Sequence, residues 1–152
     1  MKILVVSDSH GDFDTLRRIL LANQKCDIFI HCGDSELPSS YMPFELLAVK
    51  GNCDYFDDYP LKRDIKTKFG TIHVEHGNLF SALTYSYISS LNCYIYLFGH
   101  THERCAKKVD NTYIFNPGSL TEPRDSSLGS YLIIEINDES GELNYKFYDV
   151  EL

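Results

Sequence analysis

Short apolar runs bounded by glycine, aspartate or asparagine recur along this chain. Runs of this kind are typical of strands buried in a sheet. We therefore predict strands over residues 3–6, 28–30, 46–49, 72–74, 94–98, 113–115, 131–136 and 143–148.

Two other segments carry apolar residues at the spacing of an amphipathic helix. The first follows Asp12, whose carboxylate can accept hydrogen bonds from the free amides at a helix start. The apolar face of the first helix consists of Phe13, Leu16, Ile19 and Leu20, and that of the second of Phe80, Leu83, Tyr87, Ile88 and Leu91. The order strand, helix, strand in the first half favours parallel pairing.

The second half shows hairpin signals instead. Short turn sequences stand before or between predicted strands at Phe69-Gly70, Asp110-Asn111 and Ser140-Gly141. Parallel and antiparallel pairing together predict an α/β fold with two packed mixed β-sheets and helices outside them. We expect one domain over residues 1–152, because the 43% hydrophobic fraction fills a single core.

Five predicted strands are followed directly by side chains that bind metals in other proteins. These side chains are Asp8, His10, Asp34, Asn52, His76, His100 and His102. Open α/β sheets build their sites at the carboxyl ends of strands, so we expect the seven to converge. Each alone would more simply cap a helix or satisfy a core hydrogen bond. Their repetition at five strand ends argues for a shared purpose.

The donor types favour divalent ions. Two carboxylates, one amide oxygen and four imidazoles are too many for one tetrahedral ion and suit two ions sharing a carboxylate. Two such ions about 3.5–4 Å apart can hold a water, lower its pKa and neutralise phosphoryl oxygens. Hydrolysis of a phosphate ester is the natural reaction, and a carbonyl substrate stays open. The two remaining histidines, His31 and His73, lie inside apolar runs and are interpreted as satisfied core histidines.

The net charge and the lack of long apolar runs limit the kinds of molecule that this protein is expected to bind. The chain has 14 Lys and Arg against 22 Asp and Glu, a formal net charge of −8, and no basic stripe, so nucleic acid is an unfavoured partner and a nuclease an unfavoured function. Met1-Lys2 leads into the first strand with no signal-peptide layout, and no apolar run reaches about 20 residues. We predict a cytoplasmic protein with no membrane partner.

The motifs resemble those of the calcineurin-like metallophosphoesterase superfamily. The motifs occur in the same order, as Asp8-x-His10, Gly33-Asp34, Gly51-Asn52, His76-Gly77 and Gly99-His100-x-His102. The Gly51-Asn52-Cys53-Asp54 segment and the later Asn116-Pro117-Gly118-Ser119 are similar to those of the small YfcE-like phosphodiesterases. The resemblance implies a four-layer αββα sandwich and a metal-dependent phosphodiesterase that attacks a small phosphodiester with a hydroxide bridging two divalent ions.

The resemblance also implies roles for the seven residues. Asp8, His10 and His102 would hold one ion, Asn52, His76 and His100 the second, and Asp34 would bridge both. We assign catalysis to Asp34, Asn52 and His76, and substrate binding to Asn52 and Arg124. Mn²⁺ is the expected metal, with Ni²⁺, Fe²⁺, Co²⁺ and Zn²⁺ also compatible with these donors.

One position departs from the broader superfamily, where a histidine that assists the leaving group usually follows the Gly-Asn pair. Here the residue is Cys53, and a thiol is a poor acid, which favours substrates with weakly basic leaving groups. Whether Cys53 or Asp54 assists stays open. So do three alternatives: a phosphomonoesterase, a protein-binding scaffold similar to the small retromer subunit, and a homo-oligomer formed through loop aromatics.

Overall fold

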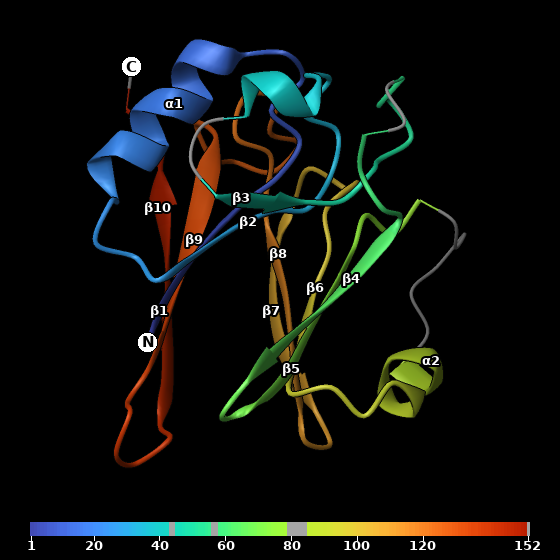
Figure 1. The fold of residues 1–152 in the computed structure, drawn as a ribbon, viewed down its shortest axis with the longest axis vertical. Helices are drawn as coiled ribbons and strands as arrows, with labels where there is room; N and C mark the ends of the chain where they lie inside the picture. The colour runs from blue at the N-terminus through green and yellow to red at the C-terminus, as the bar shows by residue number, and fades with distance from the viewer. Residues whose placement is uncertain (43–44, 56–57, 79–84, 152) are drawn as a thin grey trace.

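In the computed structural model, which describes residues 1–42, 45–55, 58–78 and 85–151, two five-stranded sheets pack face to face (Figure 1). The first sheet has the order β10-β9-β1-β2-β3 and the second β4-β5-β6-β8-β7. The strands of the first are β1 (Lys2–Val6), β2 (Ile28–His31), β3 (Leu46–Ala48), β9 (Ser130–Ile136) and β10 (Leu143–Asp149). Those of the second are β4 (Lys62–Thr67), β5 (Gly70–Glu75), β6 (Ile95–Leu97), β7 (Arg104–Val109) and β8 (Thr112–Pro117).

Both sheets are mixed, as predicted. In the first sheet β1, β2 and β3 are parallel, with α1 (Phe13–Ala22) crossing between β1 and β2, while β9 runs antiparallel to β1 and to β10. In the second, β5, β6 and β8 are parallel and the outer strands β4 and β7 are antiparallel to their neighbours. The three predicted turns join β4 to β5, β7 to β8 and β9 to β10.

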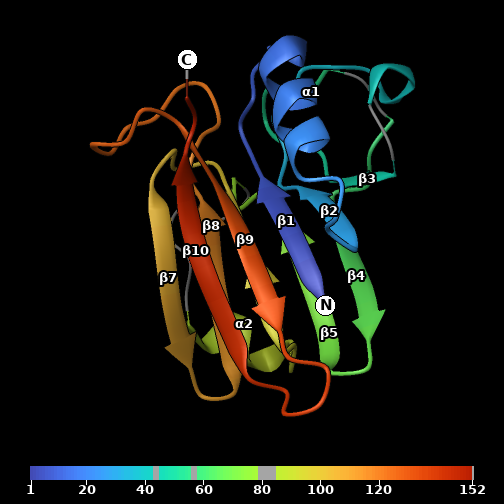
Figure 2. The same cartoon turned by 90° about the vertical axis from the view of Figure 1, so that its left-hand side faces the viewer.

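Successive side chains of a strand point to opposite faces of its sheet, and apolar residues on both faces allow the layers to pack. Ile3 and Val5 of β1 belong to the core between the sheets, whereas Leu4 and Val6 pack with Leu16 of α1 on the outer face. On the second sheet, Ile88 of α2 (Tyr85–Ser90) packs with Tyr96 and Phe98. Figure 1 shows α1 on one side of the two sheets and α2 on the other, and Figure 2 looks onto the first sheet, with α2 behind the strands. The predicted four-layer αββα arrangement is therefore confirmed.

The eight predicted strands are all present, with ends within two residues of the prediction, but β4 and β7 were not predicted as strands. Both are edge strands rich in Lys and Arg, and β4 alternates exposed and half-buried residues. Charged residues protect sheet edges, which explains why these strands lack an apolar run. Of the predicted second helix, Tyr87 and Ile88 lie in α2, whereas Phe80 and Leu83 are outside the described residues. A short 3₁₀ turn, η1 (Ser39–Tyr41), precedes β3.

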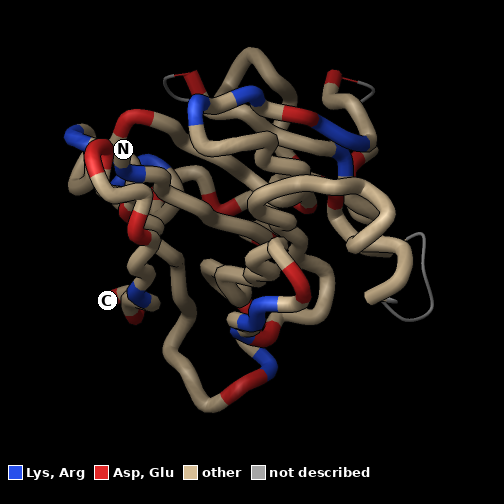
Figure 3. The backbone as a smooth tube through the Cα atoms, turned by 90° about the horizontal axis from the view of Figure 1, so that it is seen from below, with Lys and Arg blue, Asp and Glu red and all other residues tan. Residues whose placement is uncertain are grey.

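The carboxyl ends of β1, β2, β3, β5 and β6 meet at one end of the sandwich, the upper end in Figure 1. Lys and Arg are scattered among Asp and Glu along the described backbone (Figure 3). Within the described ranges, no helix has the length and apolar character needed to span a membrane.

Candidate metal centre

Asp8, directly after β1, is the centre of the first group of polar residues. Its Oδ2 atom accepts hydrogen bonds from Ser7 Oγ (2.6 Å) and from the backbone N–H of His100 (3.1 Å). Its Oδ1 atom is buried and makes no hydrogen bond, yet three Nε2 atoms surround it, those of His102 at 3.2 Å, His10 at 3.7 Å and His76 at 3.8 Å. A buried carboxylate oxygen in this state lacks the cation that would balance it.

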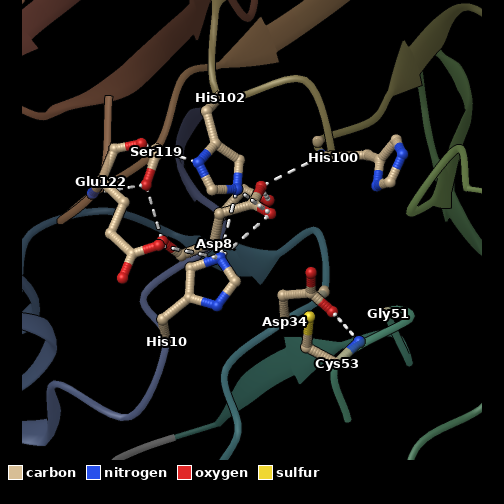
Figure 4. Close-up of polar contacts among 12 residues, drawn as sticks. Asp8, His10, Asp34, Gly51, Cys53, His100, His102, Ser119 and Glu122 are labelled. Carbon is tan, nitrogen blue, oxygen red and sulfur yellow. Dashed lines mark hydrogen bonds and ion pairs between the residues drawn. The ribbon is translucent and has the colours of Figure 1, made fainter. Parts of the chain in front are cut away.

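The rings of His10 and His102 bring their Nε2 atoms within 3.1 Å of each other beside this oxygen (Figure 4). His102 Nδ1 lies 2.7 Å from the carbonyl oxygen of Glu122, which can only accept, so Nδ1 carries a proton. A neutral His102 ring therefore presents its lone pair at Nε2. This lone pair, the His10 Nε2 atom and the Asp8 carboxylate oxygen are close enough to share one cation, a proton or a metal ion.

The second group gathers around the amide oxygen of Asn52, which lies 3.0 Å from both His76 Nε2 and His100 Nδ1. His76 Nε2 is also 3.1 Å from Asp34 Oδ2. The same tautomer argument applies, because His76 Nδ1 donates to the carbonyl oxygen of Cys32 at 2.8 Å. The Nε2 lone pair of a neutral His76 would then point at two oxygens with no positive charge between them.

Asp34 lies between the two groups. Its ligand atoms come within 4.8 Å of those of Asp8 and His76 in one set, and of His10 and Cys53 in another. Its Oδ1 atom accepts a 2.7 Å hydrogen bond from the backbone N–H of Cys53. The structure thus brings all seven predicted ligands to one place, with the Asp34 carboxylate close to both groups.

The pKa values of these residues reflect the close approach of carboxylates and imidazoles. Contact with the Asp8 carboxylate raises the pKa of His102 above its usual value. Burial lowers the pKa of His76, but the Asp34 and Asp8 carboxylates outweigh burial and the net pKa is raised. Burial likewise raises the pKa of Asp8, and contacts with His102 and His76 bring the net value below its usual range.

Five of the seven residues have an unusual backbone conformation. The φ angles of Asp8, His10, Asp34, His100 and His102 are 52°, 43°, 60°, 70° and 60°. Residues with a Cβ rarely adopt this left-handed region, and such strain is concentrated at functional sites. The loops are therefore shaped to aim these side chains inward at a cost in backbone energy.

Two glycines permit the close approach of the loops. A Cβ at Gly51 would overlap the Asp34 carboxylate, and one at Gly99 would overlap Ser7 Oγ and Asp8 Oδ2. Any larger residue at either position would push a carboxylate away from the histidines.

Asp54 is a positioning residue that the sequence did not reveal. Its buried carboxylate accepts three backbone hydrogen bonds, from Asp34 (2.9 Å), Gly51 (2.7 Å) and Glu36 (2.8 Å). These bonds tie the loop after β2 to the loop after β3. A carboxylate occupied in this way is a fixed acceptor of backbone hydrogen bonds.

The end of β8 and the residues that follow it fix two further loops. Ser119 Oγ donates to the carbonyl oxygen of Asp8 at 2.8 Å, and Asn116 Nδ2 donates to Gly99 O at 3.0 Å. Both side chains are fully buried. The sequence signal was the Asn-Pro-Gly-Ser segment, which resembled the family without suggesting what it contacts.

The remaining histidines have structural partners. Burial lowers the pKa of His31 to about 4, so its ring is neutral and Nδ1 accepts from Gly33 N at 3.1 Å. Its Nε2 atom lies 2.8 Å from Ser9 Oγ, so His31 braces the loops that carry Asp8 and Asp34. His73 lies 2.8 Å from Asp64 on the outer face of the second sheet. His31 is a satisfied core histidine, whereas the buried Nε2 atom of His73 makes no hydrogen bond and lies 3.4 Å from Glu75 Oε1.

Arg124 is exposed beside the first group. Its backbone N–H donates to the carbonyl oxygen of His102 at 2.9 Å, but its side chain is outside the seven-residue cluster. Cys53 is half-buried, and burial together with the Asp34 carboxylate raises the pKa of its thiol to about 11.

Comparison with known proteins gives the family. The model for the calcineurin-like phosphoesterase superfamily domain matches residues 1–139. The chain belongs to this superfamily. It is 32% identical to the probable metallophosphoesterase YsnB of Bacillus subtilis, over 98% of this chain and 91% of YsnB. It is 26% identical to the phosphodiesterase YfcE of Escherichia coli, over 92% of this chain and 95% of YfcE.

Solved structures with the same fold agree with this family assignment. A predicted phosphoesterase from Streptococcus pneumoniae has a TM-score of 0.80 at 27% identity, with 97% of each chain covered. Vps29 from Entamoeba histolytica, solved in complex with Zn²⁺, has a TM-score of 0.73 at 23% identity, covering 99% of this chain and 100% of that one, and shows the shared fold. The unpartnered Asp8 Oδ1 atom and the facing imidazoles fit the metal dependence of the family.

Proposed function

We propose that this chain is a phosphodiesterase that hydrolyses a small phosphodiester with two divalent metal ions. The observation that carries the proposal is the buried, unpartnered Oδ1 atom of Asp8, which faces three histidine Nε2 atoms. Proton-only networks satisfy their buried oxygens, whereas a metal site leaves its ligand atoms facing one another. The name of YfcE, a phosphodiesterase similar over most of its length, supports the choice of substrate class.

The two groups divide the ligands between the ions. Asp8, His10 and His102 would hold one ion, Asn52, His76 and His100 the other, with Asp34 shared. Divalent ions at these positions supply a water of lowered pKa and neutralise charge on the phosphoryl oxygens. We propose Mn²⁺, while Ni²⁺, Fe²⁺, Co²⁺ and Zn²⁺ suit the same oxygen and nitrogen donors.

The substrate would be held by two side chains at the rim. Asn52 is exposed, and its amide nitrogen has one contact among described residues, 3.5 Å from Cys53 Sγ, so it is free to donate to a phosphate oxygen. The backbone N–H of Arg124 donates to the carbonyl oxygen of His102 and its side chain is exposed, which supports a role for its guanidinium in binding the phosphate. Guanidinium and amide donors match the oxygens of a phosphodiester.

The chain offers little help to a leaving group. A thiol with a pKa near 11 is a weak acid at neutral pH, and the Asp54 carboxylate is committed to three backbone amides. We therefore propose a preference for substrates whose leaving group is already a weak base.

A protein-binding scaffold is the second candidate, because the Vps29 chain has the same fold. The seven converging donors favour the enzyme. A scaffold needs neither four histidines around two carboxylates nor the strained loops that aim them.

The test compares hydrolysis of bis-p-nitrophenyl phosphate and p-nitrophenyl phosphate by metal-stripped chain with and without Mn²⁺. We expect metal-dependent cleavage that favours the diester and is lost in Asp34→Asn. An Asp138→Asn variant removes a carboxylate on the β9–β10 turn and serves as the matched control. Bound metal without turnover of either ester would contradict the proposal and favour a binding role.

A further inference from the structure

We infer that Glu36 is a positioning residue that fixes the ring of His10 with Nε2 toward Asp8. This inference deepens the proposed function, on which it rests. Glu36 would bind no metal ion itself. It would act through His10, by holding the proton of that ring on the nitrogen that faces away from the cluster.

The contact is short and directional. Glu36 Oε1 lies 2.7 Å from His10 Nδ1. An ionised carboxylate can only accept, so His10 Nδ1 must carry the proton and a neutral ring presents its lone pair at Nε2. That Nε2 atom is 3.7 Å from Asp8 Oδ1 and 3.1 Å from His102 Nε2, so the lone pair enters the cluster.

The loop is shaped to deliver this carboxylate. Glu36 has a φ of 56°, in the left-handed region that residues with a Cβ avoid. Its N–H donates to Asp54 Oδ1 at 2.8 Å, and Asp54 Oδ2 accepts from Asp34 N and Gly51 N. The acceptor that fixes the Asp34 loop therefore also fixes Glu36, and the strain at Glu36 is maintained by a specific bond.

His10 differs from the other cluster histidines in the partner of its Nδ1 atom. His76 and His102 donate Nδ1–H to backbone carbonyl oxygens, and His100 Nδ1 lies against Asn52. A charged carboxylate makes a stronger hydrogen bond and a more basic imidazole than a carbonyl does. Removing such partners typically weakens metal binding by about 10- to 100-fold.

The test uses the full chain with three substitutions. Glu36→Gly removes the carboxylate and suits the φ of 56°, so backbone strain cannot explain its effect. Glu36→Gln keeps a neutral acceptor. Glu122→Gln is the matched control. The exposed Glu122 carboxylate lies 3.9 Å from His10 Nε2, so this substitution removes one negative charge near the same ring and leaves the contact at Nδ1 unchanged.

Two measurements are made on each variant. Titration calorimetry gives the Mn²⁺ affinity of metal-stripped protein, and ¹⁵N NMR of labelled histidine gives the tautomer of His10 in the metal-free chain at pH 8. We expect Glu36→Gly to bind Mn²⁺ about 10- to 100-fold more weakly and to lose the Nδ1–H tautomer. Glu36→Gln should fall between, and Glu122→Gln should stay within about threefold of the wild type.

An Nδ1–H tautomer that persists in Glu36→Gly, or a Glu36→Gly affinity equal to that of Glu122→Gln, would overturn the inference. The NMR measurement separates it from the proposed function. A wild-type chain that binds no Mn²⁺ but shows a Glu36-dependent tautomer would sustain the positioning role of Glu36 and contradict the metal-dependent activity.

Discussion

Gly51 shows how a single missing side chain decides the geometry of the cluster. The residue lies against Asp34, whose Oδ1, backbone nitrogen and Cγ are the three atoms nearest to an added Cβ. Its φ is outside the left-handed region, so the requirement for glycine is one of space rather than of conformation. The resulting approach lets the third strand end bring Asn52 beside His76.

Replacement of Gly51 by alanine should therefore displace the Asp34 carboxylate. We expect the free energy of unfolding to fall by about 1–3 kcal/mol, the usual cost of overpacking, and Mn²⁺ binding to weaken. Urea denaturation and calorimetry measure the two effects. Gly141→Ala is the control, because its φ of 75° makes alanine strained while no atom lies within 4 Å of the added Cβ. Unchanged Mn²⁺ affinity in Gly51→Ala would show that the cluster tolerates the shift.

Cys53 allows a second test at the scale of a residue. Burial and the Asp34 carboxylate make its thiol a weak acid, and the hydrogen bond that Asp34 Oδ1 accepts comes from the Cys53 backbone N–H, which alanine would keep. We expect Cys53→Ala to change kcat/KM for aryl phosphodiesters by less than about threefold, whereas loss of a general acid typically costs 10²–10⁴-fold. Steady-state kinetics with a series of leaving groups makes the comparison. A hundredfold loss confined to poor leaving groups would identify Cys53 as the acid.

At the scale of elements, the outer face of β5 carries a buried polar cluster that joins β5 to α2, β6 and β4. Glu75 Oε1 accepts from Tyr87 of α2 and Tyr96 of β6, both at 2.8 Å, and lies 3.4 Å from His73 Nε2. Lys62 of β4 is 3.6 Å from the other carboxylate oxygen. This cluster connects α2 to β5, the strand that His76 directly follows.

The pKa values of the cluster predict a pH dependence of stability. Burial lowers the pKa of His73, but Glu75 and Asp64 outweigh it and the net pKa is raised, so the stabilisation by charged His73 is complete below about pH 6.5 and is lost as pH rises through the folded value. Contacts with His73 and both tyrosines overcome burial and bring the pKa of Glu75 to about 2, so its contribution is present above about pH 4.5 and is lost as pH falls.

His73→Gln should accordingly lower the free energy of unfolding more at pH 6 than at pH 9. Denaturation at the two pH values measures the difference, with Asp64→Asn as a companion variant that removes the more exposed partner. An equal effect of His73→Gln at both pH values would show that the ring contributes by packing on Tyr96, with which it stacks at 5.6 Å, rather than by its charge.

At the scale of the whole molecule, metal binding should stabilise the fold, because the ligands come from loops after strands of both sheets. Free Mn²⁺ at about 100 times its Kd should add about 2.7 kcal/mol to the free energy of unfolding. The raised pKa values of His76 and His102 mean that protons compete with the metal, so the gain should be larger at pH 8 than at pH 6.

Thermal denaturation with and without Mn²⁺ at both pH values checks this expectation. Asp8→Asn should abolish the shift, because it removes the charge that three histidines face. A shift that is the same in Asp8→Asn as in the wild type would place the bound ion elsewhere on this chain of net charge −8.

The sequence by itself determined which elements form and which donors converge. Apolar runs and turn residues obey local rules, and parallel strands deliver the residues after them to one end of the sheets, so Asp8, Asp34 and His76 could be expected together. The edge strands β4 and β7 were not predicted, because their charged sequences contain no apolar run. Only the tertiary structure decided how the donors face one another, since His10 and His102 stand 92 residues apart in the chain. It also revealed Asp54 and Glu36, whose roles depend on hydrogen bonds between loops, and no local pattern of residues specifies the direction of a side chain across a fold.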